Sequence, residues 1–149
     1  MDSFRVLDDN TIVWLNLTGS GNETAAHLQE DDRMTILFCA FEGKPYILRL
    51  YGNAIAIHPK DKKWEELFSL FSTNLGARQI MLMRVGLIQK SCGYSIPLFE
   101  YQEERSILDN WTNKKGIEGI KNYWSERNSI SLDGKPTGID QSDAFAAKK

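Results

Sequence analysis

The chain has 149 residues, of which 42% are hydrophobic, and its formal net charge at pH 7 is −2. This length suits one domain, and basic residues spread along the chain argue against a nucleic-acid surface, where a basic stripe is expected. No apolar run approaches the roughly 20 residues that span a membrane, and the first residues lack the apolar core of a signal peptide, so we expect a cytoplasmic protein.

Cysteine usage and known motifs narrow the chemistry further. The two cysteines, Cys39 and Cys92, lie in different segments without the paired spacing of a zinc site or a disulfide framework. P-loop, GxSxG, HExxH and EF-hand patterns do not occur. We therefore expect a reducing compartment and no bound metal, and no residue is assigned a catalytic role.

Short β-rich runs separated by turns dominate the first two thirds of the chain. In chain order we predict strands over 4–7, 11–17, 34–41, 46–51, 53–58 and 78–90, a short helix over 23–29, and a helix after 58–61 whose apolar face carries Trp64, Leu67, Phe68 and Phe71. The nearly continuous apolar run 34–41 predicts a central strand. Gly52 predicts a bulge, and 96–101 predicts a continuation of the sheet.

The last third of the chain changes to helical spacing, with Gly116 between two predicted helices, 103–115 and 117–127. Strands at short spacing, joined mostly by turns, favour an antiparallel barrel that the helices plug or cover. We therefore expect one mainly β, α+β domain. Its predicted parts are a barrel core over 1–101, a helical extension over 102–139 and a disordered tail over 140–149.

A glycine-bearing segment, Gly19-Ser20-Gly21-Asn22-Glu23-Thr24, lies between a predicted strand and a predicted helix. Free N–H groups at a helix start bind phosphate, aided by roughly half a positive charge from the helix dipole. Ser20 and Glu23 have capping-box spacing, and Asn22 is an alternative N-cap. The segment therefore fits either a phosphate site or an ordinary strand–helix turn, and the carboxylate of Glu23 disfavours the phosphate.

Four other residues allow two interpretations each. Arg49 lies within an apolar strand and needs a partner, either a phosphate or a carboxylate such as that of Glu42. Cys92 is either a reactive thiol or a small buried residue beside a bulge glycine. His27 and His58 have no neighbouring ligand-like residue, which favours packing or surface roles.

Several segments also form an ordered series along the chain. They are 2–7, 17–28, 38–43, 48–52, 91–94 followed by Pro97, 133–134 and 136–138. Together, over residues 2 to about 139, they resemble a bacterial and fungal branch of the pyridoxamine 5'-phosphate oxidase-related proteins. The resemblance implies a Greek-key split barrel of the FMN-binding type, an FMN cofactor, and a homodimer with FMN at the subunit interface.

The resemblance also assigns cofactor contacts. It places the FMN phosphate at the loop and helix start that follow the second predicted strand. The implied contacts are Ser20, Asn22 and Thr24 for the phosphate, with Arg49 and Tyr94 near the flavin.

Three departures from the family pattern bear on function. Glu23-Thr24 stand where the oxidase proper has an Arg-Lys pair, and the Arg-x-His element that grips the substrate phosphate does not occur. Relatives of this branch carry a further N-terminal helix and strand, with a basic residue shortly before the position of Met1, so we expect a truncated or late-start form with weak FMN binding. The expected function is an FMN-dependent oxidoreductase of unknown substrate that does not oxidise pyridoxamine 5'-phosphate efficiently. The alternatives are a non-catalytic flavin-binding module and a structural dimer without flavin.

Overall fold

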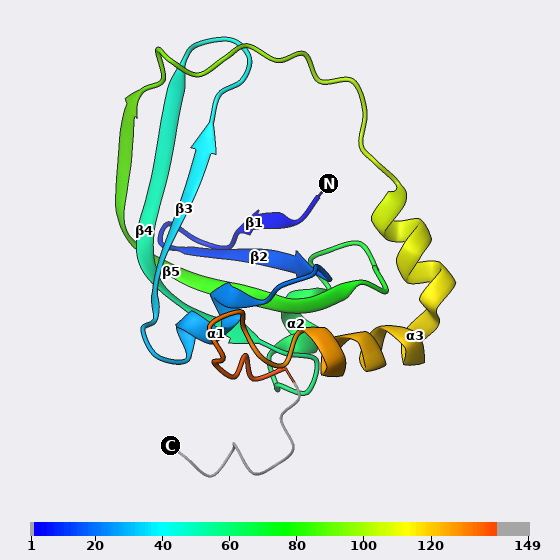
Figure 1. Ribbon diagram of the computed structural model, residues 1–149. Helices are drawn as coiled ribbons and strands as arrows, with labels where there is room; N and C mark the ends of the chain where they lie inside the picture. Colours follow the sequence, from blue (N-terminus) through cyan, green and yellow to red (C-terminus); the bar gives the residue numbers. More distant parts are fainter. Residues whose placement is uncertain (1, 140–149) are drawn as a thin grey trace.

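The computed structural model describes residues 2–139, which form a five-stranded antiparallel sheet with three helices (Figure 1). The strands are β1 (Phe4–Val6), β2 (Thr11–Leu17), β3 (Arg33–Cys39), β4 (Tyr46–Ile57) and β5 (Ala77–Cys92), and the helices are α1 (Glu23–Leu28), α2 (Trp64–Phe68) and α3 (Ile107–Arg127). Across the sheet, the strand order is β1-β2-β5-β4-β3.

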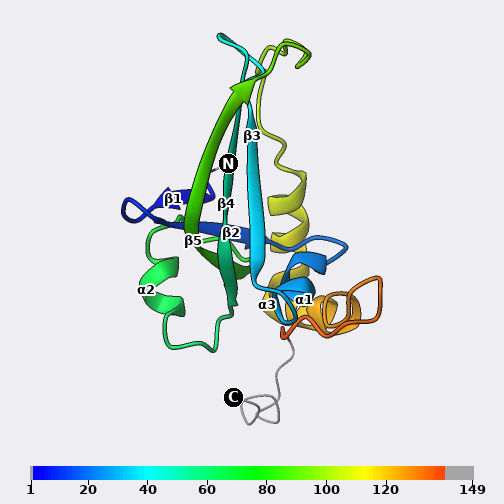
Figure 2. The same cartoon turned by 90° about the vertical axis from the view of Figure 1, so that its left-hand side faces the viewer.

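This strand order is a Greek key. Strands β3, β4 and β5 are neighbours in chain order, whereas β2 lies beside β5 and reaches β3 through the connection that carries α1. The sheet bends sharply, so that β2 crosses the lower parts of β4 and β5 in Figure 2. In the described chain the two edge strands, β1 and β3, do not pair with each other, which leaves the barrel split. The predicted class, an α+β antiparallel Greek-key split barrel, is confirmed.

Two apolar clusters cover the two faces of β2 and β5, as the alternation of their side chains predicts. The first consists of Val13, Leu15, Ile57, Trp64, Leu67, Phe71, Ala77 and Ile80. The second consists of Ile12, Leu50, Ala54 and Met83, with Phe4, Leu28, Met34, Ile36, Leu48 and Val85 packed against it. Helix α2 therefore covers one face of the sheet, on the opposite side from α1 and α3 (Figure 2).

Strand β4 is one continuous strand of 12 residues, where the sequence predicts two shorter ones. Its register against β5 shifts between Tyr51 and Gly52, which confirms the predicted bulge. A Cβ at position 52 would lie 2.9 Å from the carbonyl carbon of Arg84 and 3.0 Å from Cα of Val85. The close approach of the two backbones at the bulge therefore requires glycine.

The prediction of a central strand over 34–41 is wrong, because β3 is an edge strand. One of its faces lines the barrel interior through Met34 and Ile36. The apolar side chains of Leu37 and Phe38 remain 51% and 40% exposed. An unbroken apolar run predicts that both faces of a strand are buried. It does not determine whether the residues that bury the second face belong to the same chain.

The predicted continuation of the sheet over 96–101 is also wrong. Residues 93–106, here called the strap, contain no strand and lead from the end of β5 to α3 (Figure 1). The strap touches the sheet end through three hydrogen bonds: from the Gly93 amide to the Pro45 carbonyl (2.8 Å), from the Phe99 amide to the Phe41 carbonyl (3.0 Å) and from the Tyr101 amide to Oε1 of Glu42 (3.1 Å).

Helix α3 begins at Ile107, later than predicted, and it contains a kink at Gly116, whose φ is 65° and ψ is 174°. The two predicted helices are therefore confirmed as two helical segments on either side of that glycine. Nε1 of Trp124 donates a hydrogen bond to Oγ1 of Thr18 at 2.8 Å, which joins the second segment to the residue that follows β2. Among the described helices, none is long and apolar enough to cross a membrane. The tail predicted over 140–149 lies outside the described residues.

Candidate functional site

The glycine loop, residues 19–24, leads from the end of β2 into the first turn of α1. Two of its carbonyl groups accept hydrogen bonds from side chains of the protein interior. The Gly19 carbonyl accepts a hydrogen bond from Nδ2 of Asn128 at 3.0 Å. The Gly21 carbonyl accepts one from Arg78 at 2.8 Å. The side chains of Ser20 and Thr24 are exposed, and neither hydroxyl has a hydrogen-bond partner within the described residues. These two hydroxyls are therefore available to a ligand.

Asn22, the third predicted phosphate contact, faces the protein interior and is 3% exposed. Its Nδ2 donates to the Asn128 carbonyl at 3.2 Å, and its Oδ1 accepts from Nε2 of Gln79 at 2.6 Å. It occupies the N-cap position of α1, but neither it nor Ser20 makes a side-chain capping bond, so the capping box does not form. The Asn22 amide thus holds the loop to β5 and to the chain after α3.

A buried cation, Arg78, lies beneath the loop and is 3% exposed. Besides the Gly21 carbonyl, its guanidinium donates to Oδ1 of Asn16 from Nε at 3.1 Å and from the second terminal nitrogen at 2.6 Å. Among the described residues, no carboxylate forms an ion pair with it, and burial lowers the pKa of Arg78 to about 10, with the field of Glu23 acting in the opposite direction. Arg78 is not among the site residues predicted from the sequence. A charged side chain at the start of an otherwise apolar strand was the feature that could have indicated a buried cation there.

The carboxylate of Glu23 folds back over Gly21 in the same loop. A Cβ at position 21 would lie 2.9 Å from both Cδ and Oε1 of Glu23, and closer still to Oε2. Oε1 also accepts a hydrogen bond from the Leu132 amide at 3.3 Å. The space that glycine opens at position 21 is therefore filled by an anionic group of the chain itself.

The C-terminal hairpin, residues 129–138, lies against α1 and the glycine loop. An isolated bridge between Ile130 and Pro136 closes it. Lys135 forms an ion pair with Glu30 just after α1, and the contact raises the pKa of Lys135. Asp133 Oδ2 lies 3.9 Å from Nε2 of His27 on α1, while the hydroxyl of Ser131 holds the pKa of the Asp133 carboxyl below its ordinary value. Together with Leu132, these contacts tie the hairpin to the side of the loop where Glu23 lies.

Arg49 and Tyr94 lie far from the glycine loop within one chain. Arg49 donates a hydrogen bond to Oγ of Ser91 at 3.0 Å, so its partner is neither Glu42 nor any other carboxylate of the described chain. Arg49 is paired across β4 and β5 with Gln89, ten positions along β5 from Gln79 at the loop, a separation of up to about 30 Å. Tyr94 follows β5 in the strap and is 83% exposed. The structure therefore does not bring the five predicted contacts together in one chain.

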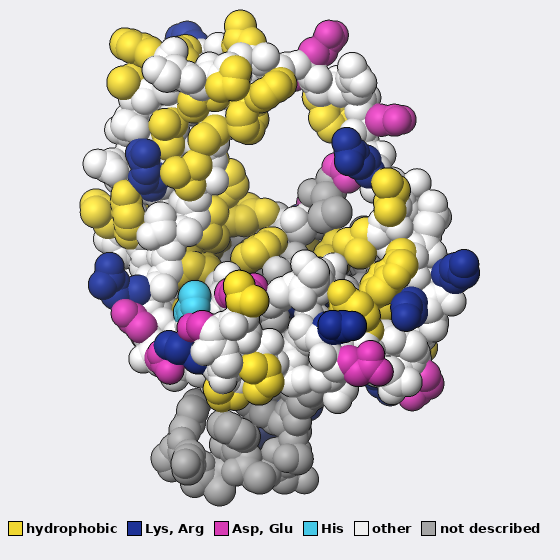
Figure 3. All heavy atoms as spheres, in the orientation of Figure 1, with side chains coloured by type: hydrophobic (Ala, Val, Ile, Leu, Met, Phe, Trp, Pro, Cys, Tyr) yellow, Lys and Arg dark blue, Asp and Glu magenta, His cyan; other side chains and the backbone are white. Residues whose placement is uncertain are grey.

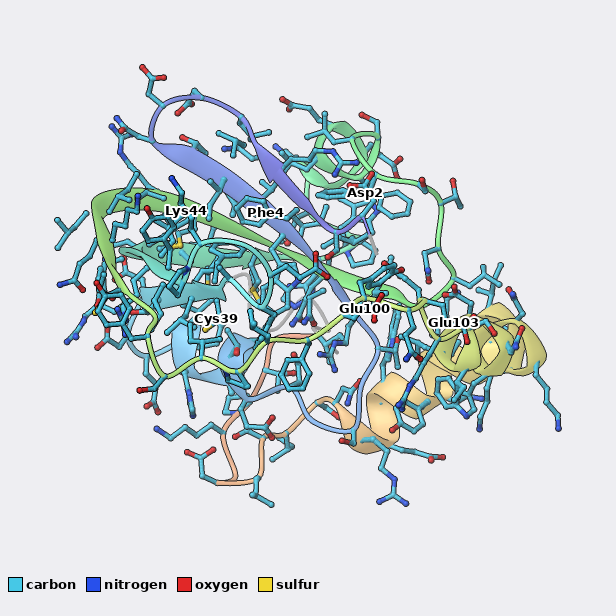
Figure 4. All side chains as sticks on the ribbon, turned by 90° about the horizontal axis from the view of Figure 1, so that it is seen from above. Asp2, Phe4, Cys39, Lys44, Glu100 and Glu103 are labelled. Carbon is cyan, nitrogen blue, oxygen red and sulfur yellow. The ribbon has the colours of Figure 1, made fainter. Side chains whose placement is uncertain are left out.

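An opening lies between the sheet, the strap and α3; apolar side chains gather on its left and upper rim, and charged side chains lie on its right rim (Figure 3). Seen from above, Phe4 and Cys39 mark the strand side, and Glu100 and Glu103 mark the strap (Figure 4). The elements that frame the opening carry exposed large apolar side chains, here called the apolar mouth: Phe38, Phe41, Tyr46, Leu98, Phe99 and Tyr101. Three of these, Leu98, Phe99 and Tyr101, are 78%, 60% and 68% exposed, an unfavourable arrangement for a chain in water.

Two hollows border the strap, and neither includes the glycine loop. One of about 290 Å³ lies between the end of β2, residues 72–74 and the first turn of α3. The other, of about 620 Å³ and widely open, lies between Phe41 and the strap residues 99–103. Within residues 2–139, no group of three or more His, Cys, Asp or Glu side chains is placed to hold a metal. Cys39 and Cys92 are both free.

A phosphate does not fit the glycine loop in this conformation. The hydroxyls of Ser20 and Thr24 and the buried charge of Arg78 favour an anion, but the carboxylate of Glu23 fills the space over Gly21. A dianionic phosphate placed there would meet a like charge at short range. The loop therefore accepts a phosphate only if Glu23 moves away.

These features define the class: an α+β split barrel with a glycine loop after its second strand and an open apolar mouth. Over 149 aligned residues the chain is 30% identical to the pyridoxamine 5'-phosphate oxidase family protein ustO of Aspergillus flavus, an alignment that covers 90% of this chain. The chain spans 60% of the length of that curated relative. The predicted resemblance is confirmed: the chain is similar to a protein that carries the name of the pyridoxamine 5'-phosphate oxidase family.

No known protein-family model matches the chain. Among solved structures, the chain is similar to the 1.98 Å crystal structure of a histidine-to-alanine variant of HupZ from Group A Streptococcus, with a TM-score of 0.47 and 16% sequence identity. That similarity covers 60% of this chain and 73% of the HupZ chain.

Proposed function

We propose that this protein is an FMN-binding, FMN-dependent oxidoreductase whose flavin site is completed by a second copy of the chain. One structural relationship carries the proposal: the glycine loop and the Arg49–Tyr94 region lie at opposite ends of β5 in a single chain. The proposal is that one flavin takes its phosphate contacts from the loop of one subunit and its ring contacts from the Arg49–Tyr94 region of the other. In the proposed two-fold dimer, the loop of one subunit would lie beside the Arg49–Tyr94 region of its partner.

The apolar mouth supports the same assembly. Exposed large side chains cluster on β3, on the start of β4 and on the strap, whereas scattered single exposures need no explanation. A second subunit that covers β3 would also protect an edge strand whose outward face exposes Leu37. The single chain therefore leaves uncovered a surface that a homodimer would bury.

FMN, when bound, would supply the redox chemistry, and the protein would supply binding and orientation. Arg49 offers a half-buried positive charge that no carboxylate of the described chain neutralises, and Tyr94 offers an exposed aromatic ring. The free hydroxyls of Ser20 and Thr24 offer neutral donors at the loop. No side chain is assigned to acid–base chemistry, and the substrate stays unassigned.

Cofactor extraction and solution mass test the proposal together. The purified protein should show a flavin absorption spectrum or acquire one on incubation with FMN, and mass spectrometry of the released ligand should give FMN. Light scattering should give about twice the 17.0 kDa chain mass. Stoichiometric FAD or haem, or a monomer that binds no flavin, contradicts the proposal. Reduction of the bound flavin by NAD(P)H separates an oxidoreductase from a flavin-binding module.

A structural dimer without flavin is the second candidate. The observation that favours it is the carboxylate of Glu23, which fills the space over Gly21 in the glycine loop. For this candidate, light scattering still gives a dimer, but neither FMN nor riboflavin binds at micromolar concentration.

A further inference from the structure

We propose that Glu23 is a specificity-determining residue: its carboxylate occupies the glycine loop as an internal anion and excludes phosphate until the side chain swings out. The identity of the biological ligand, the phosphate of FMN, rests on the proposed function. The exclusion itself concerns this chain's own residues.

The geometry of the loop supports an occupied anion position. Both oxygens of the Glu23 carboxylate lie against Gly21, in space that any side chain at position 21 would fill. The Leu132 amide donates to this carboxylate at 3.3 Å, which supplies a backbone donor to the anion. A side chain at position 21 would displace the flexible end of Glu23, so glycine leaves room for the carboxylate in this conformation.

A buried positive charge provides a second observation. Arg78 is 3% exposed, donates to the Gly21 carbonyl and lies within the electrostatic field of Glu23. Its other bonded partner, Asn16, is neutral. A buried cation without an ion pair is costly, so a nearby anion is favoured at this place. In this conformation, Glu23 is that anion.

The C-terminal hairpin determines how readily Glu23 leaves. The hairpin holds the carboxylate through Leu132, and it is itself attached to the α1 region by the Lys135–Glu30 ion pair. The Lys135–Glu30 contact is exposed, and an exposed pair is weak. Ser131 and Thr137 of the hairpin are nevertheless buried, so Glu23 leaves most readily by breaking its own hydrogen bond to the Leu132 amide while the hairpin stays in place.

The test compares the wild type with Glu23→Gln, which keeps the shape and removes the charge, and with Glu23→Asp, which keeps the charge. Glu126→Gln, an exposed change on α3, is the matched control. Inorganic phosphate is titrated while the amide signals of Gly19 and Gly21 are followed by NMR. We expect Glu23→Gln to bind phosphate at the loop at least about tenfold more tightly than the wild type and Glu126→Gln. Glu23→Asp should show a smaller gain.

Equal phosphate affinity in the wild type and Glu23→Gln, or loop signals that phosphate shifts in neither protein, would overturn the inference. Thermal unfolding of each variant confirms that it is folded. FMN and riboflavin are titrated in parallel: Glu23→Gln should raise the affinity for FMN relative to riboflavin. Failure of both flavins to bind any variant counts against the proposed function alone, because the phosphate titration still decides the role of Glu23.

Discussion

Phe4 of β1 and Phe38 of β3 meet edge to face, with ring centroids 5.3 Å apart and an interplanar angle of 81°. The two strands are the opposite edges of the sheet and are not hydrogen-bonded to each other. The contact therefore joins the split side of the barrel by side chains alone. It also places Phe4 beside the second apolar cluster, which fills the barrel interior.

A double-mutant cycle should detect this contact. Phe4→Ala and Phe38→Ala should each lower the free energy of unfolding, and the two losses should be non-additive by about 0.5–1.5 kcal/mol, the usual coupling of an aromatic pair. Urea unfolding of the two single variants and the double variant gives the coupling energy. Strict additivity would show that the edges of the barrel are independent.

Removal of the buried guanidinium should be costly. Arg78→Met leaves the Gly21 carbonyl without its donor and Oδ1 of Asn16 with Gln79 alone, so we expect a loss of about 2–4 kcal/mol in the free energy of unfolding. Arg84→Gln, an exposed change on the same strand, serves as the control and should change stability by less than about 0.5 kcal/mol. Similar urea midpoints for the two variants would contradict a structural role of Arg78 at the loop.

His58 should make stability depend on pH. Burial lowers its pKa in the folded protein, opposed by Asp61 and Gln79 and reinforced by Lys60 and Arg78. The unfolded chain therefore takes up a proton near pH 6.5 that the folded chain resists. The free energy of unfolding is therefore highest above pH 6.5, where His58 is neutral in both states. It falls as the pH is lowered toward the folded pKa, by at most about 1.4 kcal/mol per pH unit.

Urea unfolding between pH 7.5 and 5 measures this loss. His58→Gln should flatten the decline in the free energy of unfolding. A slope that survives in His58→Gln would assign the pH dependence to other groups.

Two glycines of α3 should respond in opposite directions to alanine. Gly116 has a φ of 65° and a ψ of 174°, and a Cβ there would meet no atom within 4 Å. Gly116→Ala should therefore cost about 1–3 kcal/mol through backbone strain alone. Gly119→Ala, where the added Cβ would approach only the flexible Lys115 side chain, should stabilise the helix by about 0.5–1 kcal/mol. Thermal unfolding compares the stability of the two variants. A change in stability of the same sign for both would contradict the kink at Gly116.

The sequence by itself determined most of the elements of this protein. The alternation along β2 and β5 predicted two apolar faces, Gly52 marked the bulge, and Gly116 separated two helical segments. These features depend on side-chain periodicity and on backbone freedom, which are local properties of the chain. The series of family segments also identified the split barrel, because these segments occur together in one branch of related proteins.

Only the tertiary structure decided how the loop after β2 is occupied. The pattern of small and polar residues allowed Asn22 to cap a helix or to bind phosphate, but Gln79 and Asn128, from distant parts of the chain, turn it inward. The side of the sheet on which β3 lies, and the separation of Arg49 from the loop, likewise depend on strand order. Strand order and the packing of distant segments are set by contacts between residues far apart in the sequence, and no local pattern encodes them.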